Sequence, residues 1–385
     1  MTEQTASTSS GVEGAAQRRP RVLVLYGGRS SEHSISCVSA GGVLAALDAR
    51  QWDVVTVGID RQGRWWLTEV TPTDLAAVDG VLPEVRPTAD PVALAPGDDG
   101  PRLHSIAEAG GKDLGVVDVV FPLLHGPWGE DGAIQGWLES VSAAYVGSGV
   151  LTSAVAMDKA AMKLALQAHG LPVGPFEVVH DGEWQRGRDR VLARVEFALS
   201  LPVFVKPVRA GSSIGITRVT NWADLGSAID EARRHDPRVI VEESVSGAEI
   251  ECGVLGAGRS HDDFPQASTT ARIVLRDGRA FYDFDAKYLD DAADLVVPSG
   301  LPGEVDARVR EMAVRAFTAL GCEGLARVDF FVDDHGVITI NEVNTMPGFT
   351  PTSMYPRMWQ AAGVEYAELI DRLLTLALQR DRGLR

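Results

Sequence analysis

The chain has 385 residues, of which 45% are hydrophobic and 23% are charged, and its formal net charge is −17. This composition is typical of a globular protein with two or three domains, and the negative charge argues against nucleic acid or an anionic membrane as a partner. No stretch approaches the ~18 apolar residues of a membrane span. The three cysteines, Cys37, Cys252 and Cys322, lie far apart without metal-binding spacing, so we expect a reduced, cytoplasmic protein.

The N-terminal part of the chain predicts a polar tail followed by an α/β domain. Residues 1–20 lack an apolar core, so they do not form a signal peptide and we expect a disordered tail. Residues 21–26 and 53–59 are apolar runs typical of buried strands, with a helical pattern between them. We therefore expect residues 21–147 to form an α/β domain with a doubly wound parallel sheet.

The turn after the first strand contains Gly27 and Gly28, followed by Glu32. A dinucleotide-binding fingerprint requires a third glycine that is absent here. Glu32 would also repel a phosphate group at the start of the next helix but would attract an ammonium group. From these residues alone, an ammonium site and a surface helix cap are equally good interpretations.

The loop at 125–136 contains four glycines together with His125, Glu130 and Asp131. It follows a short buried strand, and the carboxyl ends of parallel strands are where open α/β sheets bind ligands. A structural turn does not need three ionisable side chains, so we interpret this loop as part of a ligand site. The preceding residues, 68–113, are rich in Pro, Asp and Gly and predict no clear element.

Residues 148–246 are expected to form a second lobe. Asp158 is a good cap for a helix that ends near His169. Apolar runs at 201–207, 216–219 and 238–243 predict strands.

A glycine- and serine-rich loop at 209–215 follows Lys206 in this lobe. Its backbone N–H groups and the hydroxyls of Ser212 and Ser213 could surround phosphate groups, while the lysine supplies positive charge. The spacing is not that of a P-loop. An ordinary hairpin turn is the alternative interpretation.

Residues 247–385 are expected to form a third lobe, with a helix over 304–320. The segment at 281–288 combines aromatic side chains with a lysine. Phe281 could flank a nucleotide base, and the alternative is a strand with one aromatic face.

The most informative pattern lies at 325–344, where two β-rich runs flank a turn and predict a hairpin. Because side chains alternate along a strand, Arg327, Asp329, Glu342 and Asn344 should share one face. Two carboxylates and an amide oxygen are hard ligands suited to Mg²⁺. The alternative is a solvated strand face with one surface ion pair.

The turn also predicts the register of this hairpin. If Asp333 faces Gly336, then Arg327 faces Glu342. Asp329 would then be a diagonal neighbour of Glu342, about 7–8 Å away at the backbone.

In this order, the motifs resemble those of the D-alanine–D-alanine ligases, members of the ATP-grasp superfamily, from about Arg21 to the C-terminus. The loop at 125–136 and the run at 324–348 are the most specific matches. The resemblance implies an α/β fold, with α+β character in the ATP-binding half. In this fold the N-terminal domain precedes a two-lobed ATP-grasp region.

The resemblance also implies roles for the residues at matching positions. For ATP binding it implies Lys159, Lys206, Ser213, Glu242, Glu243, Val245, Glu249, Phe281 and Lys287. For two Mg²⁺ ions, which Mn²⁺ could replace, it implies Asp329, Glu342 and Asn344. For substrate binding it implies Glu32, His125, Ser353 and Met354, and for catalysis Glu32, Ser212, Tyr288, Arg327 and Gly348.

The reaction implied is ATP-dependent ligation of two D-alanines through a D-alanyl phosphate, for peptidoglycan precursor synthesis, by a homodimer. A D-alanine–D-lactate or D-alanine–D-serine ligase is the close alternative, although Tyr288 favours an amine acceptor. An ATP-binding regulator without turnover is disfavoured because Lys159, Lys206 and Arg327 are all present. A dinucleotide oxidoreductase would leave the acidic hairpin face unexplained.

Overall fold

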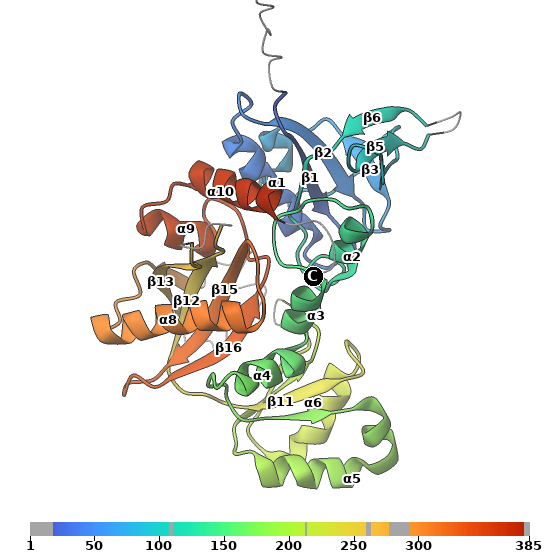
Figure 1. The fold of residues 1–385 in the computed structure, drawn as a ribbon. Coiled ribbons are helices and arrows are strands. Elements are labelled where there is room, and N and C mark those ends of the chain that lie inside the picture. Colours follow the sequence, from blue (N-terminus) through green and yellow to red (C-terminus); the bar gives the residue numbers. More distant parts are fainter. Residues whose placement is uncertain (1–17, 108–110, 212–213, 259–262, 277–292, 381–385) are drawn as a thin grey trace, which may run out of the picture.

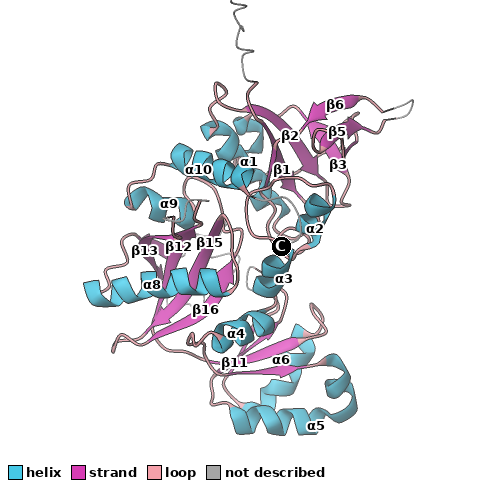
Figure 2. Cartoon of the chain, in the orientation of Figure 1, coloured by secondary structure: helices cyan, strands magenta, loops and turns pink. Residues whose placement is uncertain are grey.

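The computed structural model describes residues 18–107, 111–211, 214–258, 263–276 and 293–380, so most of the expected tail lies outside it. Within these residues the chain forms four β-sheets with helices packed against them (Figures 1 and 2). The coarse prediction of a mixed α/β protein is confirmed. Among the described helices, none combines the length and hydrophobicity that a membrane crossing requires.

The first sheet has the strand order β3-β2-β1-β7. Its strands are β1 (Arg21–Gly27), β2 (Asp53–Ile59), β3 (Trp65–Thr68) and β7 (Val119–Pro122). Strand β1 pairs in parallel with β2 and β7, as expected, whereas β3 is an antiparallel edge strand. Alternate side chains of β1 enter two different apolar clusters, which explains why the strand is a continuous hydrophobic run.

Helices cover both faces of this sheet. Helix α1 (His33–Ala46) and the C-terminal helix α10 (Tyr366–Gln379) contribute to the apolar cluster on one face, and α2 (Ala133–Ser140) contributes to the other. Figure 1 shows α10, in red, beside α1, in blue. The end of the chain therefore returns to the first sheet.

The segment that predicted no clear element forms a small antiparallel sheet in the order β4-β5-β6. Its strands are β4 (Val92–Ala95), β5 (Arg102–Ser105) and β6 (Asp113–Val116), and a 3₁₀ helix, η1 (Pro72–Leu75), precedes them. Each strand has four residues. Such short strands give too little alternation for recognition in the sequence.

The second large sheet is antiparallel, in the order β10-β9-β11-β8. Its strands are β8 (Phe176–Val179), β9 (Val203–Pro207), β10 (Thr217–Val219) and β11 (Val239–Glu243). The helices around it are α3 (Val150–Met157), α4 (Lys159–Ala168), α5 (Asp181–Ala198), η2 (Trp222–Asp224) and α6 (Leu225–Ala232). The Asp158 side chain accepts a hydrogen bond from the Ala161 N–H at 2.9 Å, so the expected cap of α4 is confirmed.

The third sheet, in the order β14-β13-β12-β15-β16, is antiparallel throughout. Its strands are β12 (Ala248–Leu255), β13 (Gln266–Leu275), β14 (Ala293–Val296), β15 (Leu325–Val332) and β16 (Ile338–Asn344). Helix α8 (Gly303–Ala319) packs against one face, where Val328 and Phe330 are fully buried, and α9 (Met354–Ala361) lies nearby. The opposite face of β15 carries Arg327 and Asp329.

The apolar face of the third sheet should dominate the stability of this region. Phe330 is completely buried, whereas Phe197 at the end of α5 is 94% exposed. We expect Phe330→Ala to lower the free energy of unfolding by about 3–5 kcal/mol, because it leaves a cavity in the core. Phe197→Ala should change it by less than about 0.5 kcal/mol. Urea denaturation measures both, and equal effects would contradict this description of the core.

Candidate active site

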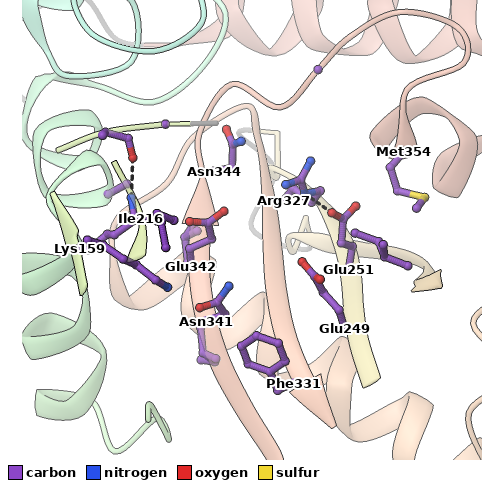
Figure 3. Close-up of a pocket in the computed structure, with 18 of the residues that line it drawn as sticks. Lys159, Ile216, Glu249, Glu251, Arg327, Phe331, Asn341, Glu342, Asn344 and Met354 are labelled. Atoms are coloured by element: carbon purple, nitrogen blue, oxygen red, sulfur yellow. Dashed lines mark hydrogen bonds and ion pairs between the residues drawn. The ribbon is translucent and has the colours of Figure 1, made fainter. Parts of the chain in front are cut away.

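A cavity of about 890 Å³ lies between the second and third large sheets and the loops that follow β1 and β7 (Figure 3). Most of the expected site residues line it: Glu32, Lys159, Lys206, Glu242, Glu243, Val245, Glu249, Arg327, Glu342, Asn344, Gly348, Ser353 and Met354. His125 and Asp329 do not line this cavity and are buried. The remaining expected residues lie outside the described part of the chain: Ser212, Ser213, Phe281, Lys287 and Tyr288.

The expected register of the β15–β16 hairpin was wrong for two reasons. The N–H of Asp333 donates to the carbonyl of Val337 at 3.1 Å, so the turn is one residue longer than a pairing with Gly336 requires. A β-bulge then adds Asn341 to β16 without a partner on β15. Such a bulge cannot be read from an alternating pattern, because it inserts one residue into one strand.

The expected polar face of the hairpin is nevertheless confirmed. Arg327 faces Asn344 and Asp329 faces Glu342, a shift of two residues from the expected pairing. A shift of two residues keeps each side chain on its face. Asp329 and Glu342 are therefore directly opposite, with about 4.5–5.5 Å between their Cβ atoms.

Three carboxylates form a row across this face, because Glu251 pairs with Asp329, which pairs with Glu342. Arg327 Nε lies 2.7 Å from Asp329 Oδ1 and 3.3 Å from Glu251 Oε1. Burial alone would lower the pKa of Arg327, but these carboxylates raise it well above its usual value. Arg327 is therefore shared between two carboxylates of the row, and the charge of Lys206 interacts with the third, Glu342.

The donor atoms on this face fit a hard divalent cation. Glu342 supplies a carboxylate oxygen and Asn344 an amide oxygen at the cavity, and the Asp329 carboxylate, whose two oxygens accept from Arg327 at 2.7 Å each, lies directly opposite Glu342. Figure 3 shows Glu342 and Asn344 projecting from the same strand at the cavity. Within the described residues, no cluster of three His, Cys, Asp or Glu side chains has the arrangement of a metal site. Mg²⁺ needs no such cluster, because it usually takes one or two carboxylates together with water and phosphate.

Glu242 of β11 lies between two lysines. Its Oε1 is 2.8 Å from Lys163 Nζ and its Oε2 is 2.5 Å from Lys206 Nζ. Burial would raise the pKa of Glu242, but the two ammonium groups lower it overall. Burial would likewise lower the pKa of Lys206, and Glu242 and Glu342 raise it.

Sequence reasoning missed Lys163, Glu251 and Asn341, which all line the cavity. Lys163 lies four residues after Lys159 on α4, so helical spacing predicts that both side chains share a face. Glu251 lies two residues after Glu249 on β12, which places both carboxylates on one face of the strand. The sequence therefore contained a signal for two of these residues.

Two of the expected ATP-binding residues are held by backbone groups. Lys159 Nζ donates to the Ala210 carbonyl at 2.7 Å, drawn as a dashed line in Figure 3. Its ammonium therefore lies beside the loop expected to bind phosphate. Glu243 Oε2 accepts from the Ser200 N–H at 2.8 Å, so this side chain fastens the loop before β9.

Glu32 lies just before α1 and is 7% exposed. Its side chain makes no capping hydrogen bond to the helix, so the surface-cap interpretation is wrong. A Cβ atom at Gly126 would lie 2.5 Å from Glu32 Oε2, and one at Gly211 would lie 3.1 Å away. Glycine at these positions lets two loops approach the carboxylate closely.

His125 makes hydrogen bonds through both ring nitrogens. Nδ1 lies 3.0 Å from the Met346 carbonyl and Nε2 lies 3.0 Å from Ser39 Oγ. Nδ1 must carry the proton, because a carbonyl oxygen can only accept. Burial lowers the pKa of His125, so the ring is neutral and Ser39 donates to Nε2.

Glu130 also lines the cavity, close to Glu32. Its Oε1 accepts from the Gly126 N–H at 2.6 Å. Burial and the charge of Glu32 raise the pKa of Glu130 to about 8. The carboxyl group is therefore largely protonated at neutral pH.

Ser353 and Met354 lie at the start of α9. Ser353 Oγ accepts from the Thr350 N–H at 3.1 Å, and a Cβ atom at Gly348 would lie 3.2 Å from the same oxygen. The first N–H groups of a helix favour an anion such as a carboxylate. This end of the cavity is therefore suited to a carboxylate ligand.

The lysines, the acidic sheet face and the helix N-terminus together suit an enzyme that binds a nucleotide phosphate and a small zwitterion. Comparisons with known proteins agree. Family models described as D-ala D-ala ligase N-terminus and C-terminus match residues 21–148 and 165–375. A D-alanine–D-alanine ligase of Kineococcus radiotolerans is 54% identical over 380 residues, covering 96% of this chain and 100% of the relative.

Solved structures of a D-Ala:D-Ser ligase and of a D-alanine–D-alanine ligase also align with this chain. The VanG D-Ala:D-Ser ligase from Enterococcus faecalis aligns with a TM-score of 0.79 and 33% identity, covering 94% of this chain and 100% of that one. The D-alanine–D-alanine ligase from Coxiella burnetii aligns with a TM-score of 0.73 and 34% identity, covering 94% of each chain. The chain belongs to the D-alanine–D-alanine ligase family, as its motifs predicted.

The buried charge cluster around Glu242 predicts a pH-dependent stability. Glu242→Gln should lower the free energy of unfolding at pH 7 by about 3–5 kcal/mol, because it leaves Lys163 and Lys206 buried without their counter-charge. The folded-state pKa of Glu242 lies below its usual value of 4.5, so this contribution is complete above pH 4.5. It is lost as the pH falls through the lower, folded-state pKa.

Urea unfolding of both proteins at pH 7, 5.5 and 3 measures this effect. The difference between wild type and variant should be equal at the two higher pH values and smaller at the lowest. The matched control is Glu368→Gln, which removes an exposed ion pair with Arg372 and should change stability by less than about 0.5 kcal/mol. A similar effect for both variants would mean that the Glu242 cluster contributes no more than a surface pair.

Proposed function

We propose that this chain ligates two D-alanines to D-alanyl-D-alanine, with ATP as the energy source and a D-alanyl phosphate as intermediate. The product serves peptidoglycan precursor synthesis. The observation that carries the proposal is the meeting, in one cavity, of Lys159 and Lys206, the acidic face around Arg327, and Glu32. The first groups suit a triphosphate, and the last suits an ammonium group.

The nucleotide end of the cavity is assigned to the second large sheet and β12. Lys159 and Lys206 would neutralise phosphate oxygens, and Glu242 would accept from the adenine amino group while holding Lys206 in place. Glu243 and Val245 would contact ATP near the adenine base, and Glu249 would bind the ribose. Ser212, Ser213, Phe281 and Lys287 keep the roles implied by family resemblance.

Bound Mg²⁺, held by Asp329, Glu342 and Asn344, would supply positive charge to the phosphates during transfer. Mn²⁺ has similar oxygen-ligand chemistry and is a reasonable substitute. We assign two ions by family resemblance.

The substrate end is assigned to Glu32, Ser353, Met354 and Gly348. Glu32 would hold the ammonium of the first D-alanine, whose carboxylate oxygen attacks the γ-phosphorus with loss of ADP. The amine of the second D-alanine then attacks the acyl carbonyl and phosphate leaves. Ser353 and the Met354 backbone would hold the second carboxylate.

The tetrahedral species formed in the second step carries an oxyanion, which Arg327 and the Gly348 N–H would stabilise. His125 is assigned to positioning rather than direct substrate contact, because both ring nitrogens bond within the protein. Tyr288 and Ser212 are expected to close over the site with Glu32. Exclusion of water would protect the acyl phosphate from hydrolysis.

Three further expectations belong to this proposal. The chain divides into lobes at 21–147, 148–246 and 247–385, and the enzyme acts in the cytoplasm. It forms a homodimer, which would explain exposed apolar side chains on the contacting helices α2 and α3, such as Trp137 and Leu151.

The direct test is phosphate release from ATP and Mg²⁺ with D-alanine as the sole amino acid. We expect release that depends on D-alanine, with D-alanyl-D-alanine detected by chromatography. ATP binding without D-alanine-dependent release would instead indicate a regulator. D-lactate and D-serine added in competition test the acceptor, since the VanG enzyme is named for D-serine. If the ratio of dipeptide to depsipeptide product rises as the pH is raised, the acceptor reacts through its amine.

Arg327→Lys tests the oxyanion role without losing the buried charge. Lysine lacks the forked guanidinium, so kcat should fall by about 10²–10³-fold while ATP binding stays nearly unchanged. Alanine is unsuitable, because it would leave Asp329 and Glu251 uncompensated and cost about 3–5 kcal/mol of stability. The control is Arg372→Lys in the exposed pair with Glu368. An unchanged kcat in Arg327→Lys would remove Arg327 from the oxyanion role.

A further inference from the structure

The β-bulge at Asn341 determines which side chains of β16 reach the polar face of the third sheet. With this extra residue in β16, Asp329 pairs with Glu342. In a ladder without the extra residue, Asp329 would face Asn341, and Glu342 would face Val328. Val328 is fully buried in the apolar cluster beneath α8, where an unpaired carboxylate would be costly. The acidic face therefore depends on the bulge.

Lys163 of α4 holds the backbone of this extra residue. A bulged residue lacks its ladder hydrogen bonds, so its backbone groups need other partners. Lys163 Nζ donates to the Asn341 carbonyl at 3.3 Å, across 178 residues of sequence. The same nitrogen lies 2.8 Å from Glu242 Oε1, and the Lys163 side chain is buried. One ammonium group thus joins the bulge of the third sheet to β11 of the second large sheet.

Helix α4 and the segment after it also hold β16 on both sides of the bulge. The Ile340 N–H donates to the Pro172 carbonyl at 2.9 Å, and the Val343 N–H donates to Met162 Sδ at 3.2 Å. Because β16 is the last strand of the described sheet, its outer backbone groups need partners from outside that sheet. A thioether is a weak acceptor, whereas the hydrogen bond from the Lys163 ammonium group is charge-assisted.

We propose that Lys163 is a positioning residue, which holds the bulge at Asn341 and so keeps Glu342 opposite Asp329, where both can hold a divalent cation. The ion pair with Glu242 fixes the ammonium group from the other side. The metal-binding role of the two carboxylates rests on the proposed function, whereas the contact with the bulge does not. Lys163 needs no contact with substrate or metal to act in this way.

The test compares Lys163→Met with two control variants in the full chain. Methionine is an unbranched side chain of similar length without the ammonium group, and Glu242 keeps its ion pair with Lys206 at 2.5 Å. Leu164→Ala changes the exposed neighbour on the same helix. Leu225→Ala weakens the apolar cluster formed by the second large sheet and its helices, so it reports the effect of lower stability alone.

Hydrogen exchange of ligand-free protein, followed by mass spectrometry, reports the bulge directly. In Lys163→Met, exchange over residues 340–344 should speed by about tenfold, the effect of one lost hydrogen bond. Exchange over 248–255 in β12, two strands away, should stay unchanged. Leu164→Ala should leave both segments unchanged, and Leu225→Ala should not single out residues 340–344.

Metal binding provides the second readout and needs no turnover. Binding of Mn²⁺ at saturating ADP can be followed by electron paramagnetic resonance. The Kd for Mn²⁺ should rise by about tenfold in Lys163→Met, because the loss of a residue that orients metal ligands weakens metal binding, and it should stay within about threefold in Leu164→Ala. The Mg²⁺ concentration for half-maximal phosphate release should rise by the same factor, while the KM for D-alanine stays within about threefold.

Unchanged exchange over 340–344 in Lys163→Met would overturn the proposal, and so would an equal change in Leu225→Ala. If Lys163→Met does not fold, exchange in the shorter, uncharged Lys163→Gln decides in the same way. Faster exchange with an unchanged Kd for Mn²⁺ would also overturn it, since the bulge would then not position the metal ligands. A wild-type chain that forms no dipeptide would refute the proposed function, while exchange would still decide whether Lys163 holds the bulge.

Discussion

The acidic row on the third sheet is the feature around which the rest of the site is arranged. Glu251, Asp329 and Glu342 lie side by side on three strands, with Arg327 bound to the first two. Buried carboxylates this close are costly unless cations compensate them. The fold therefore gathers negative charge on one wall of the cavity and cations beside it, which is a physical basis for binding metal and nucleotide together.

The buried lysines on the opposite wall of the cavity also need a counter-charge, which in their case is a carboxylate. Lys163 and Lys206 would repel each other in a buried site, and Glu242 between them makes both tolerable. The charge of Lys206 also interacts with Glu342, so the two walls are coupled electrostatically. Arg327 lies among the carboxylates of one wall, and Glu242 lies between the lysines of the other. These ion pairs hold the side chains in place without a ligand. Preorganisation of this kind lets binding groups act without first reordering.

The sequence predicted the parts of the site that depend on local patterns. Alternation along β15 and β16 placed Arg327 and Asp329 on the correct face, and Asp158 marked the start of α4 correctly. The hairpin register was wrong because the turn is one residue longer than expected and because the bulge at Asn341 has no signature in an alternating pattern. Contacts between distant segments, such as His125 with Met346, were also beyond reach, since they depend on how three sheets pack together.

The segment that carries Gly348 shows how this packing determines the chemistry. Met346 and Phe349 flank Gly348, and both are buried in the apolar cluster that includes β1, β7 and α10. The Phe349 ring packs against Phe121 and Tyr366, with centroids 5.6 and 5.7 Å apart. A loop that begins on the third sheet is thereby fixed to the core of the first. Because an oxyanion donor must be held to a fraction of an ångström, the position of the Gly348 N–H depends on the N-terminal core as much as on the strand that precedes it.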